Sequence, residues 1–184
     1  MSPTGPTTIE TARLRLRPLV LADTMSLHRI QSDPEHMRFY PHPFSLQESR
    51  EWILRMQERY ARDGFALLAV VDRATDEFLG NVGPLVQTVD GVAEVELGWS
   101  ITPTRSRQGI ATEAALASRE WVFASLPVDH VVSLIHPDNA PSRGVAEKLG
   151  MTVWKEVRWG RERPRIHLVY RAARPHVTPT REPA

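Results

Sequence analysis

The sequence predicts one domain of mixed α/β (α+β) class, with a central mixed, mostly antiparallel twisted sheet flanked by helices. The chain has 184 residues, a length typical of a single domain. Its 41% hydrophobic and 24% charged residues are an ordinary globular composition. Three successive strand patterns occupy the middle of the chain, and strands alternate with helices after them. No repeat or internal linker divides this order.

The first part of the chain contains a strand and two helices. Residues 13–19 alternate leucine with charged residues, which is typical of a half-buried strand. A short helix is expected to begin at Asp23 and to reach about Ile30. Ser45 and Glu48 have the spacing of a capping box, so a longer helix is expected to begin there and to end at Gly64.

The middle of the chain predicts three antiparallel strands. Residues 65–72 are a continuous apolar run, residues 78–86 form the returning strand, and residues 92–101 follow as the third. The Asp90-Gly91 pair between the last two is a hairpin signal. Glycines within residues 78–86 indicate places where another backbone approaches closely.

The last part alternates helix and strand. Apolar residues spaced four, three, four and three apart from Ile110 to Ala124 predict an amphipathic helix. A buried strand is expected over 130–135, and a helix over 139–150 with Asn139 as its N-cap and Gly150 as its stop. Residues 152–159 and 165–170 are expected to form the final two strands.

Composition and charge exclude several functional classes. The net charge of +1 offers no electrostatic basis for binding nucleic acid or an anionic membrane. The absence of cysteine excludes thiolate metal sites and a cysteine nucleophile, and the seven histidines lack metal-ligand spacing. The start has no signal peptide and no apolar run could span a membrane. We therefore expect a cytoplasmic protein without a metal, with flexible ends at 1–8 and 172–184.

The loop before the long second-half helix could hold a phosphate. The first amides of a helix lack internal partners and carry partial positive charge, so an anion can accept from several of them. Gly109 and Ala111 would leave this backbone accessible, and Arg105 and Arg107 could add charged contacts. The loop matches neither common phosphate-binding consensus, however, so on its own an ordinary turn is the favoured interpretation.

Longer stretches carry a family resemblance. "ELGWSITPTRSRQGIATEAA" followed by "NAPSRGVAEKLGMTVWKE" resembles the GNAT superfamily of acyl-CoA-dependent N-acetyltransferases, and most of all its RimJ/RimL-like ribosomal-protein branch. "IETARLRLRPLVLADTMSLHRIQSDPEHMRFY" and "FLGNVGPL" are similar to the same branch. The resemblance covers roughly Ile9 to Tyr170 and implies an N-acetyltransferase domain over 9–171. It also implies that a splayed pair of strands holds the coenzyme.

The resemblance implies acetyl-CoA as co-substrate and assigns residues to it. Asn139 and Ser142 would face the pantetheine and thiol end, and Trp99 and Ile101 would lie near the pantetheine arm. The pyrophosphate would lie on six consecutive amides, those of Arg107, Gln108, Gly109, Ile110, Ala111 and Thr112.

Two departures from the family pattern bear on this assignment. Ser106 stands where Gln or Arg is common, which leaves the detail of the phosphate contacts open. Ala146 stands where many members have a tyrosine that protonates the leaving thiolate. The Ser142 hydroxyl is then a candidate for that role, and a helix-cap serine is the alternative.

Glu94 and Glu96 are candidate bases. They alternate with Val95 and so share one face of a strand. The resemblance favours Glu96, and a solvated carboxylate is the alternative. Glu113 is interpreted as a surface charge that complements the helix dipole. The tryptophans at 99, 154 and 159 are expected to serve packing rather than an acceptor pocket.

The predicted reaction is direct acetyl transfer to a primary amine in a ternary complex. The resemblance favours a protein or peptide N-terminal α-amine, and residues 38–44 and 158–165 would line its site. The alternatives are a small-molecule acceptor such as an antibiotic or polyamine, or a non-catalytic acyl-CoA sensor. The expected partners are therefore acetyl-CoA and an amine, without nucleic acid or membrane, and a homodimer stays open.

Overall fold

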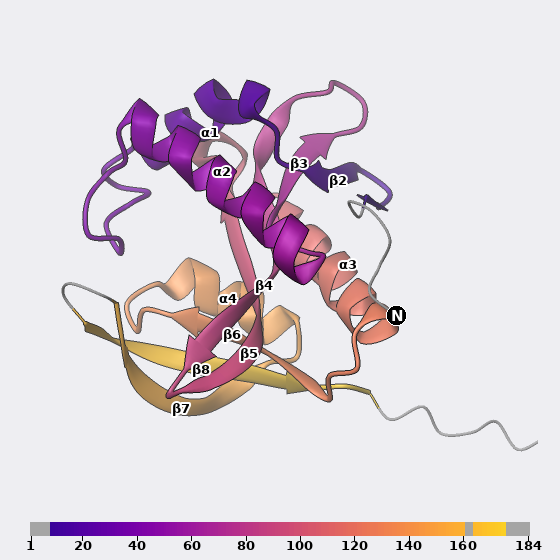
Figure 1. Cartoon of the computed structure of the whole chain (residues 1–184), viewed down its shortest axis with the longest axis vertical. Helices are drawn as coiled ribbons and strands as arrows, with labels where there is room; N and C mark the ends of the chain where they lie inside the picture. The colour runs from indigo at the N-terminus through magenta and orange to yellow at the C-terminus, as the bar shows by residue number, and fades with distance from the viewer. Residues whose placement is uncertain (1–7, 161–163, 176–184) are drawn as a thin grey trace, which may run out of the picture.

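One twisted sheet organises the molecule (Figure 1). A computed structural model describes residues 8–160 and 164–175. Within these residues eight strands form the order β1-β2-β3-β4-β5-β6-β8-β7, and four α-helices pack against them. Neighbouring strands are antiparallel except β5 and β6, which are parallel. The predicted single α+β domain with a mixed, mostly antiparallel sheet is confirmed.

Each predicted strand and helix is present. The two-residue β1 and two 3₁₀ turns were not predicted, since segments this short have no readable period. The described elements are β1 (Ile9–Glu10), β2 (Leu14–Pro18), η1 (Leu21–Asp23), α1 (Thr24–Gln31), α2 (Leu46–Asp63), β3 (Leu68–Asp72), β4 (Phe78–Val89), β5 (Val92–Ile101), η2 (Pro103–Arg105), α3 (Ile110–Ser125), β6 (His130–Ile135), α4 (Ala140–Lys148), β7 (Thr152–Trp159) and β8 (Arg165–Ala173).

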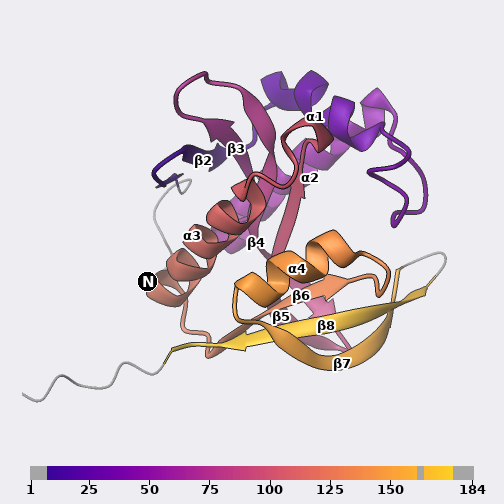
Figure 2. The same ribbon diagram turned by 180° about the vertical axis from the view of Figure 1, so that it is seen from behind.

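The helices cover opposite faces of the sheet. Figure 1 shows α1 and α2 in front of it, and Figure 2, seen from behind, shows α3 and α4 in front. The core follows the same division. Leu27 of α1 and Ile53 of α2 belong to one apolar cluster, whereas Ile110 of α3 and Ala146 of α4 belong to a larger one.

The helix signals read from the sequence are present as hydrogen bonds. Ser45 Oγ accepts from the Glu48 amide at 3.2 Å, and Glu48 Oε2 accepts from the Ser45 amide at 2.7 Å, which completes the capping box. Gly64 ends α2 with φ 82°, a left-handed conformation that favours glycine. Asp23 precedes α1, but its carboxylate accepts from the Arg17 side chain and the Val20 amide rather than capping the helix.

A close backbone approach explains a glycine in β4. Gly80 has φ 144°, and a Cβ there would lie 2.1 Å from the Ser100 carbonyl oxygen of β5. No side chain fits that space, so the prediction from the strand glycines is confirmed at this position. The contact places β4 directly against the end of β5 that leads into the candidate site.

The domain extends slightly beyond its expected boundary. Strand β8 runs to Ala173, whereas a flexible tail was expected from 172, and Arg174 donates to the carbonyls of Phe123, Leu126 and Val128. Backbone pairing with β6 holds these last residues, which the apolar pattern alone did not indicate. The remainder of the expected ends, 1–7 and 176–184, lies outside the described residues. In the described ranges, no helix has the length and apolar character that crossing a membrane requires.

Candidate active site

The parallel strands β5 and β6 separate after a single paired position. Their recorded register joins Glu96 to Val132 only. Beyond it, side chains replace the backbone ladder: Ser133 Oγ donates to the Leu97 carbonyl at 2.7 Å, and the Leu134 amide donates to Glu96 Oε1 at 3.4 Å. A split of this kind opens the sheet between the ends of two strands, as the expected splayed pair requires.

The helix α3 begins on exposed backbone beside this split. Its N-cap is Gly109, which has φ 77° and provides no side-chain cap. Residues 107–109 are exposed, and Ala111 and Thr112 are half-buried. The first amides of α3 are therefore open to an anion, and they carry the positive end of a sixteen-residue helix dipole.

The turn before α3 is strained. Arg107 has φ 60°, a left-handed conformation that costs a residue other than glycine about 1 kcal/mol or more. Such strain is found where the surrounding structure holds a segment in a functional shape. Arg105 was expected at the rim of a phosphate site, but its guanidinium instead bonds Asp72 at 3.1 Å and Glu77 at 3.2 Å. It thus ties the loop to the β3–β4 turn.

The start of α4 follows closely on the end of β6, one of the two strands that part. The predicted N-cap is confirmed, since Asn139 Oδ1 accepts from the Ser142 amide at 3.3 Å. Arg143 donates to Tyr170 Oη at 3.0 Å and to the Pro137 carbonyl at 3.2 Å, which anchors the first turn of α4 to β8. Ser142 itself is half-buried, and its cap interaction uses its amide and leaves its hydroxyl available.

We predict that Ser142→Ala lowers kcat by about 10- to 100-fold and leaves the affinity for coenzyme A nearly unchanged, because backbone donors share the stabilisation of a leaving thiolate. The amide that Asn139 caps is retained in the alanine variant, so the helix start persists. Steady-state kinetics with calorimetric binding measures both quantities. A wild-type kcat would remove Ser142 from the catalytic residues.

Glu96 lies at the point where the strands part. Burial raises the pKa of its carboxyl to about 7, although hydrogen bonds from the Leu134 amide and Gln87 and the charge of Arg59 oppose the shift. Gln87 Nε2 donates to Glu96 Oε2 at 3.3 Å. A carboxylate with a pKa near the working pH is well matched to general base catalysis.

Glu94, the other candidate base, is paired with His130 instead. Its Oε2 lies 2.8 Å from His130 Nε2, and its side chain is only 11% exposed. His130 also contacts Asp129. Glu94 lies two positions before Glu96 on β5, so it is in an ion-pair cluster and not beside the open strand ends.

Imidazole and aromatic rings form a wall near the end of β5; Phe39 and Tyr40 lie in the expected acceptor lining at 38–44, whereas His36, His136 and His167 were not predicted there. His36 Nε2 lies 2.8 Å from Ser100 Oγ. The Phe39 ring stacks on His136 at 5.0 Å between centroids, and His136 meets the edge of His167 at 5.8 Å. Reduced contact with water and the charge of Glu96 raise the pKa of Tyr40, which places its hydroxyl within electrostatic reach of that carboxylate.

This wall draws on three separate parts of the chain. His36, Phe39 and Tyr40 come from the segment between α1 and α2, His136 directly follows β6, and His167 belongs to β8. Burial lowers the pKa of both His36 and His167, so both imidazoles are neutral at pH 7. Part of the expected lining, residues 161–163, lies outside the described residues.

The tryptophans and Glu113 occupy distinct positions. Trp99 packs against the core cluster beneath α3 and α4, as does Ile101. Trp159 packs on a smaller cluster, and Trp154 is 44% exposed with the charge of Lys155 at 4.4 Å from its ring centre. Glu113 lies in the first turn of α3, as expected, and is 22% exposed; its bonds to Arg13 and Thr11 were not predicted. Helix periodicity could not reveal partners a hundred residues away.

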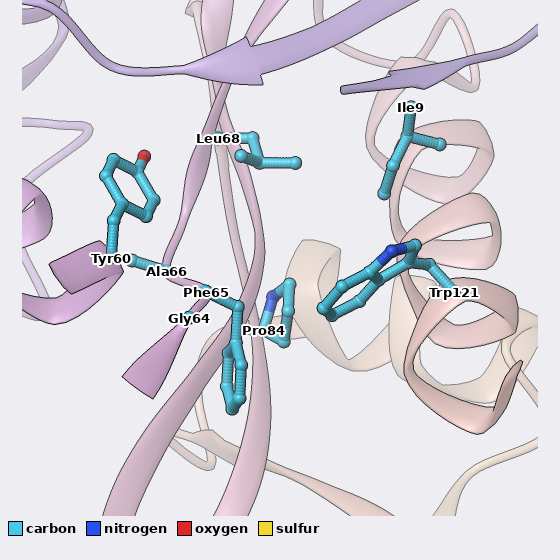
Figure 3. A pocket seen from close by; sticks show the side chains of 8 residues that line it. All are labelled: Ile9, Tyr60, Gly64, Phe65, Ala66, Leu68, Pro84 and Trp121. Carbon is cyan, nitrogen blue, oxygen red and sulfur yellow. The ribbon is translucent and has the colours of Figure 1, made fainter. Parts of the chain in front are cut away.

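Figure 3 shows an apolar hollow between the end of α2 and α3, lined by side chains that include Tyr60, Phe65 and Trp121. Its volume of about 10 Å³ holds one water molecule at most, so it cannot accept a coenzyme. In the part of the chain that the structure describes, no three His, Asp or Glu side chains are grouped to hold a metal ion.

Comparison with known proteins identifies related chains. Residues 13–152 match the family model described as the acetyltransferase (GNAT) domain. The uncharacterized protein YkkB of Bacillus subtilis (strain 168) is 31% identical over 153 residues, which are 83% of this chain and 89% of that protein.

Solved structures share the fold. The acetyltransferase from Agrobacterium tumefaciens str. C58 is 30% identical, with a TM-score of 0.78 over 91% of this chain and 95% of that one. RimL, a ribosomal L7/L12 α-N-protein acetyltransferase solved in complex with coenzyme A, has a TM-score of 0.68 over 91% of this chain and 98% of that one. At 15% identity, the second comparison shows a common fold alone.

Proposed function

We propose that this chain, which belongs to the GNAT acetyltransferase family, acetylates the N-terminal α-amine of a protein or peptide. Family membership makes it an acetyl-CoA-dependent N-acetyltransferase. The acceptor, the residues that bind the coenzyme and the catalytic residues are the proposal. The observation that carries it is the Glu96 carboxyl, with a pKa of about 7, at the split between β5 and β6.

The open start of α3 fits the phosphates of the coenzyme. Residues 107–109 are exposed and Ala111 and Thr112 are half-buried at the positive end of the helix, while the Ile110 side chain between them is buried in the core. Ordinary side-chain caps are missing there, so the amides have no competing partner on their own helix end. The adjacent strand end at Trp99 and Ile101 and the start of α4 at Asn139 and Ser142 would hold the pantetheine arm.

Acetyl-CoA supplies an acetyl group on a thioester, whose carbon–sulfur bond breaks as a carbon–nitrogen bond to the acceptor forms. Glu96 accepts the proton that the amine nitrogen must lose. Ser142 and nearby amides would stabilise the departing thiolate, and the Ser142 hydroxyl would pass it a proton and take one back from solvent water. The wall formed by Phe39, His136 and His167 orients the acceptor against the opened strands.

The pKa of Glu96 favours an α-amine over lysine. An α-amino group has a pKa of about 7.7–8.0, so transfer of its proton to a carboxylate of pKa about 7 costs only about 1 kcal/mol. A lysine of pKa about 10.4 costs about 4.6 kcal/mol in the same transfer. Among the residues described around Glu96, the imidazoles of His36 and His167 are neutral at pH 7 and have lowered pKa values, so they do not provide a stronger base.

We predict that peptides with a free N-terminus are acetylated faster than N-terminally blocked, lysine-containing peptides of the same sequence. Intact-mass analysis after incubation with acetyl-CoA measures the extent, and fragmentation locates each acetyl group. The matched control is the same free peptide with its lysine replaced by arginine, which should react equally well.

Two results would contradict the α-amine assignment. Acetylation confined to lysine side chains would show that the site deprotonates a much weaker acid. Acetylation of an added aminoglycoside or polyamine, with both peptides unreacted, would identify a small-molecule acceptor and leave the family assignment in place.

A further inference from the structure

Arg13, the residue directly before β2, is tied to the beginning of α3. Its Nε and Nη2 lie 2.7 and 2.6 Å from Glu113 Oε2, and its Nη1 donates to the Gln108 carbonyl at 3.1 Å. We propose that Arg13 is a positioning residue for coenzyme binding, which holds the Arg107–Gly109 turn in the shape that leaves its amides open. This inference rests on the proposed coenzyme site and adds a residue to it from a distant part of the chain.

The bond to Gln108 sets the direction of an amide. The carbonyl of Gln108 and the N–H of Gly109 belong to one planar trans peptide and point in opposite directions. Because the carbonyl points to Arg13, the Gly109 N–H points away from the guanidinium, on the exposed side of the turn. Arg13 Nη2 also lies only 3.6 Å from where a Cβ of Gly109 would be, so it packs against the other side of this residue.

Glu113, in the first turn of α3, is held in place by hydrogen bonds from the segment before β2. Its Oε1 accepts from Thr11 Oγ1 at 2.6 Å and from the Arg13 amide at 3.2 Å. Thr11 Oγ1 in turn accepts from the Leu14 amide at 2.9 Å, so the turn between β1 and β2 closes around this carboxylate. Partial burial alone would raise the pKa of Glu113, but the hydrogen bonds from Thr11 and Arg13 outweigh it and lower that pKa.

The contacts of Arg13 with Glu113 and Gln108 counter two features that would weaken anion binding at the start of α3. Arg107 and Gly109 both have positive φ, a conformation that an unrestrained turn would leave readily. Glu113 also places a negative charge in the first turn of the helix that would receive an anion. The Arg13 guanidinium neutralises the Glu113 carboxylate, and its bond to the Gln108 carbonyl restrains the turn. The planar guanidinium can bond both acceptors at the same time.

The test measures coenzyme A binding by calorimetry on the full chain, with no acceptor present. We expect Arg13→Ala to raise the dissociation constant about tenfold, the value of one lost charge-assisted contact. Arg13→Lys should bind coenzyme A nearly as weakly as Arg13→Ala, because a lysine ammonium cannot bond the Glu113 carboxylate and the Gln108 carbonyl in the geometry of a guanidinium. Arg15→Ala is the matched control: it removes the next arginine along the chain, which pairs with Asp76 instead of Glu113, and should leave the dissociation constant within about twofold.

Glu113→Gln separates positioning from simple charge. If Arg13 served only as a counterion, loss of the carboxylate would free its charge for the phosphates and tighten binding. Positioning predicts weaker binding instead, and a double variant with Arg13→Ala should bind no worse than Arg13→Ala alone. In kinetics, the KM for acetyl-CoA should rise by the same factor as the dissociation constant while kcat stays within about twofold.

Circular dichroism establishes whether each variant is folded. If Arg13→Ala does not fold, the binding test relies on the conservative variants Arg13→Lys and Glu113→Gln. Wild-type affinity in Arg13→Lys, or tighter binding in Glu113→Gln, would overturn the positioning role and leave the proposed function standing. A wild-type protein that does not bind coenzyme A would overturn the proposed function and this inference together.

Discussion

Replacing Ala111 with aspartate is expected to weaken coenzyme A binding by about thirtyfold or more, equivalent to about 2 kcal/mol. Ala111 is the second residue of α3, where an exposed or half-exposed backbone would receive the pyrophosphate. A carboxylate there would fill the space of the phosphate and repel its charge. Titration calorimetry on wild type and variant measures the difference directly.

The stability of this variant distinguishes lost binding from lost folding. An acidic residue in the first turn of a helix is favoured by the helix dipole, so Ala111→Asp should melt no lower than wild type. The matched control is Ala124→Asp, which adds the same charge at an exposed position of α3, about 20 Å along the helix from Ala111. Unchanged affinity in a folded Ala111→Asp protein would exclude the start of α3 as the phosphate site.

Glu96→Gln is expected to lower kcat/KM by about 100-fold at pH 8, since a general base contributes about that much or more. Wild-type kcat/KM should rise with pH through about 7 as the carboxyl ionises, and the glutamine variant should lack that step. The loss should therefore be smallest below pH 6, where the wild-type carboxyl is itself protonated. A pH–rate profile of both proteins tests this expectation.

Glu96→Gln, which is expected to lower activity, should stabilise the folded protein. The folded protein holds the Glu96 pKa near 7, above the ordinary value of 4.5, so folding loses stability as pH rises between these two values. Glu96→Gln removes that loss and should raise the free energy of unfolding above pH 7. Glu94→Gln is the control, because its carboxylate pairs with His130 away from the split. A Glu96→Gln enzyme with the wild-type pH profile would exclude Glu96 as the base.

Local signals in the sequence were sufficient for most of the fold. Ser45 and Glu48 meet within one turn of helix, and Asn139 caps α4 three residues before Ser142, so each pair could be identified from spacing alone. Strand β5 was predicted with its observed bounds, because the Asp90-Gly91 turn precedes it and a polar loop follows it in the sequence. Phe65 to Leu67 are buried without ladder pairing, so the predicted strand there began too early.

What the sequence determined by itself is the order of elements, the single α+β domain and the backbone at Gly109, because these depend on contacts between residues close in the chain. Tertiary structure alone decided the pKa of Glu96, which depends on burial and on hydrogen bonds from Gln87 and Leu134. It also brought His36 to Ser100 and Arg13 to Glu113, partners separated by 64 and 100 residues. Sequence spacing carries no information about such pairs, since the folding of the whole sheet sets their distance.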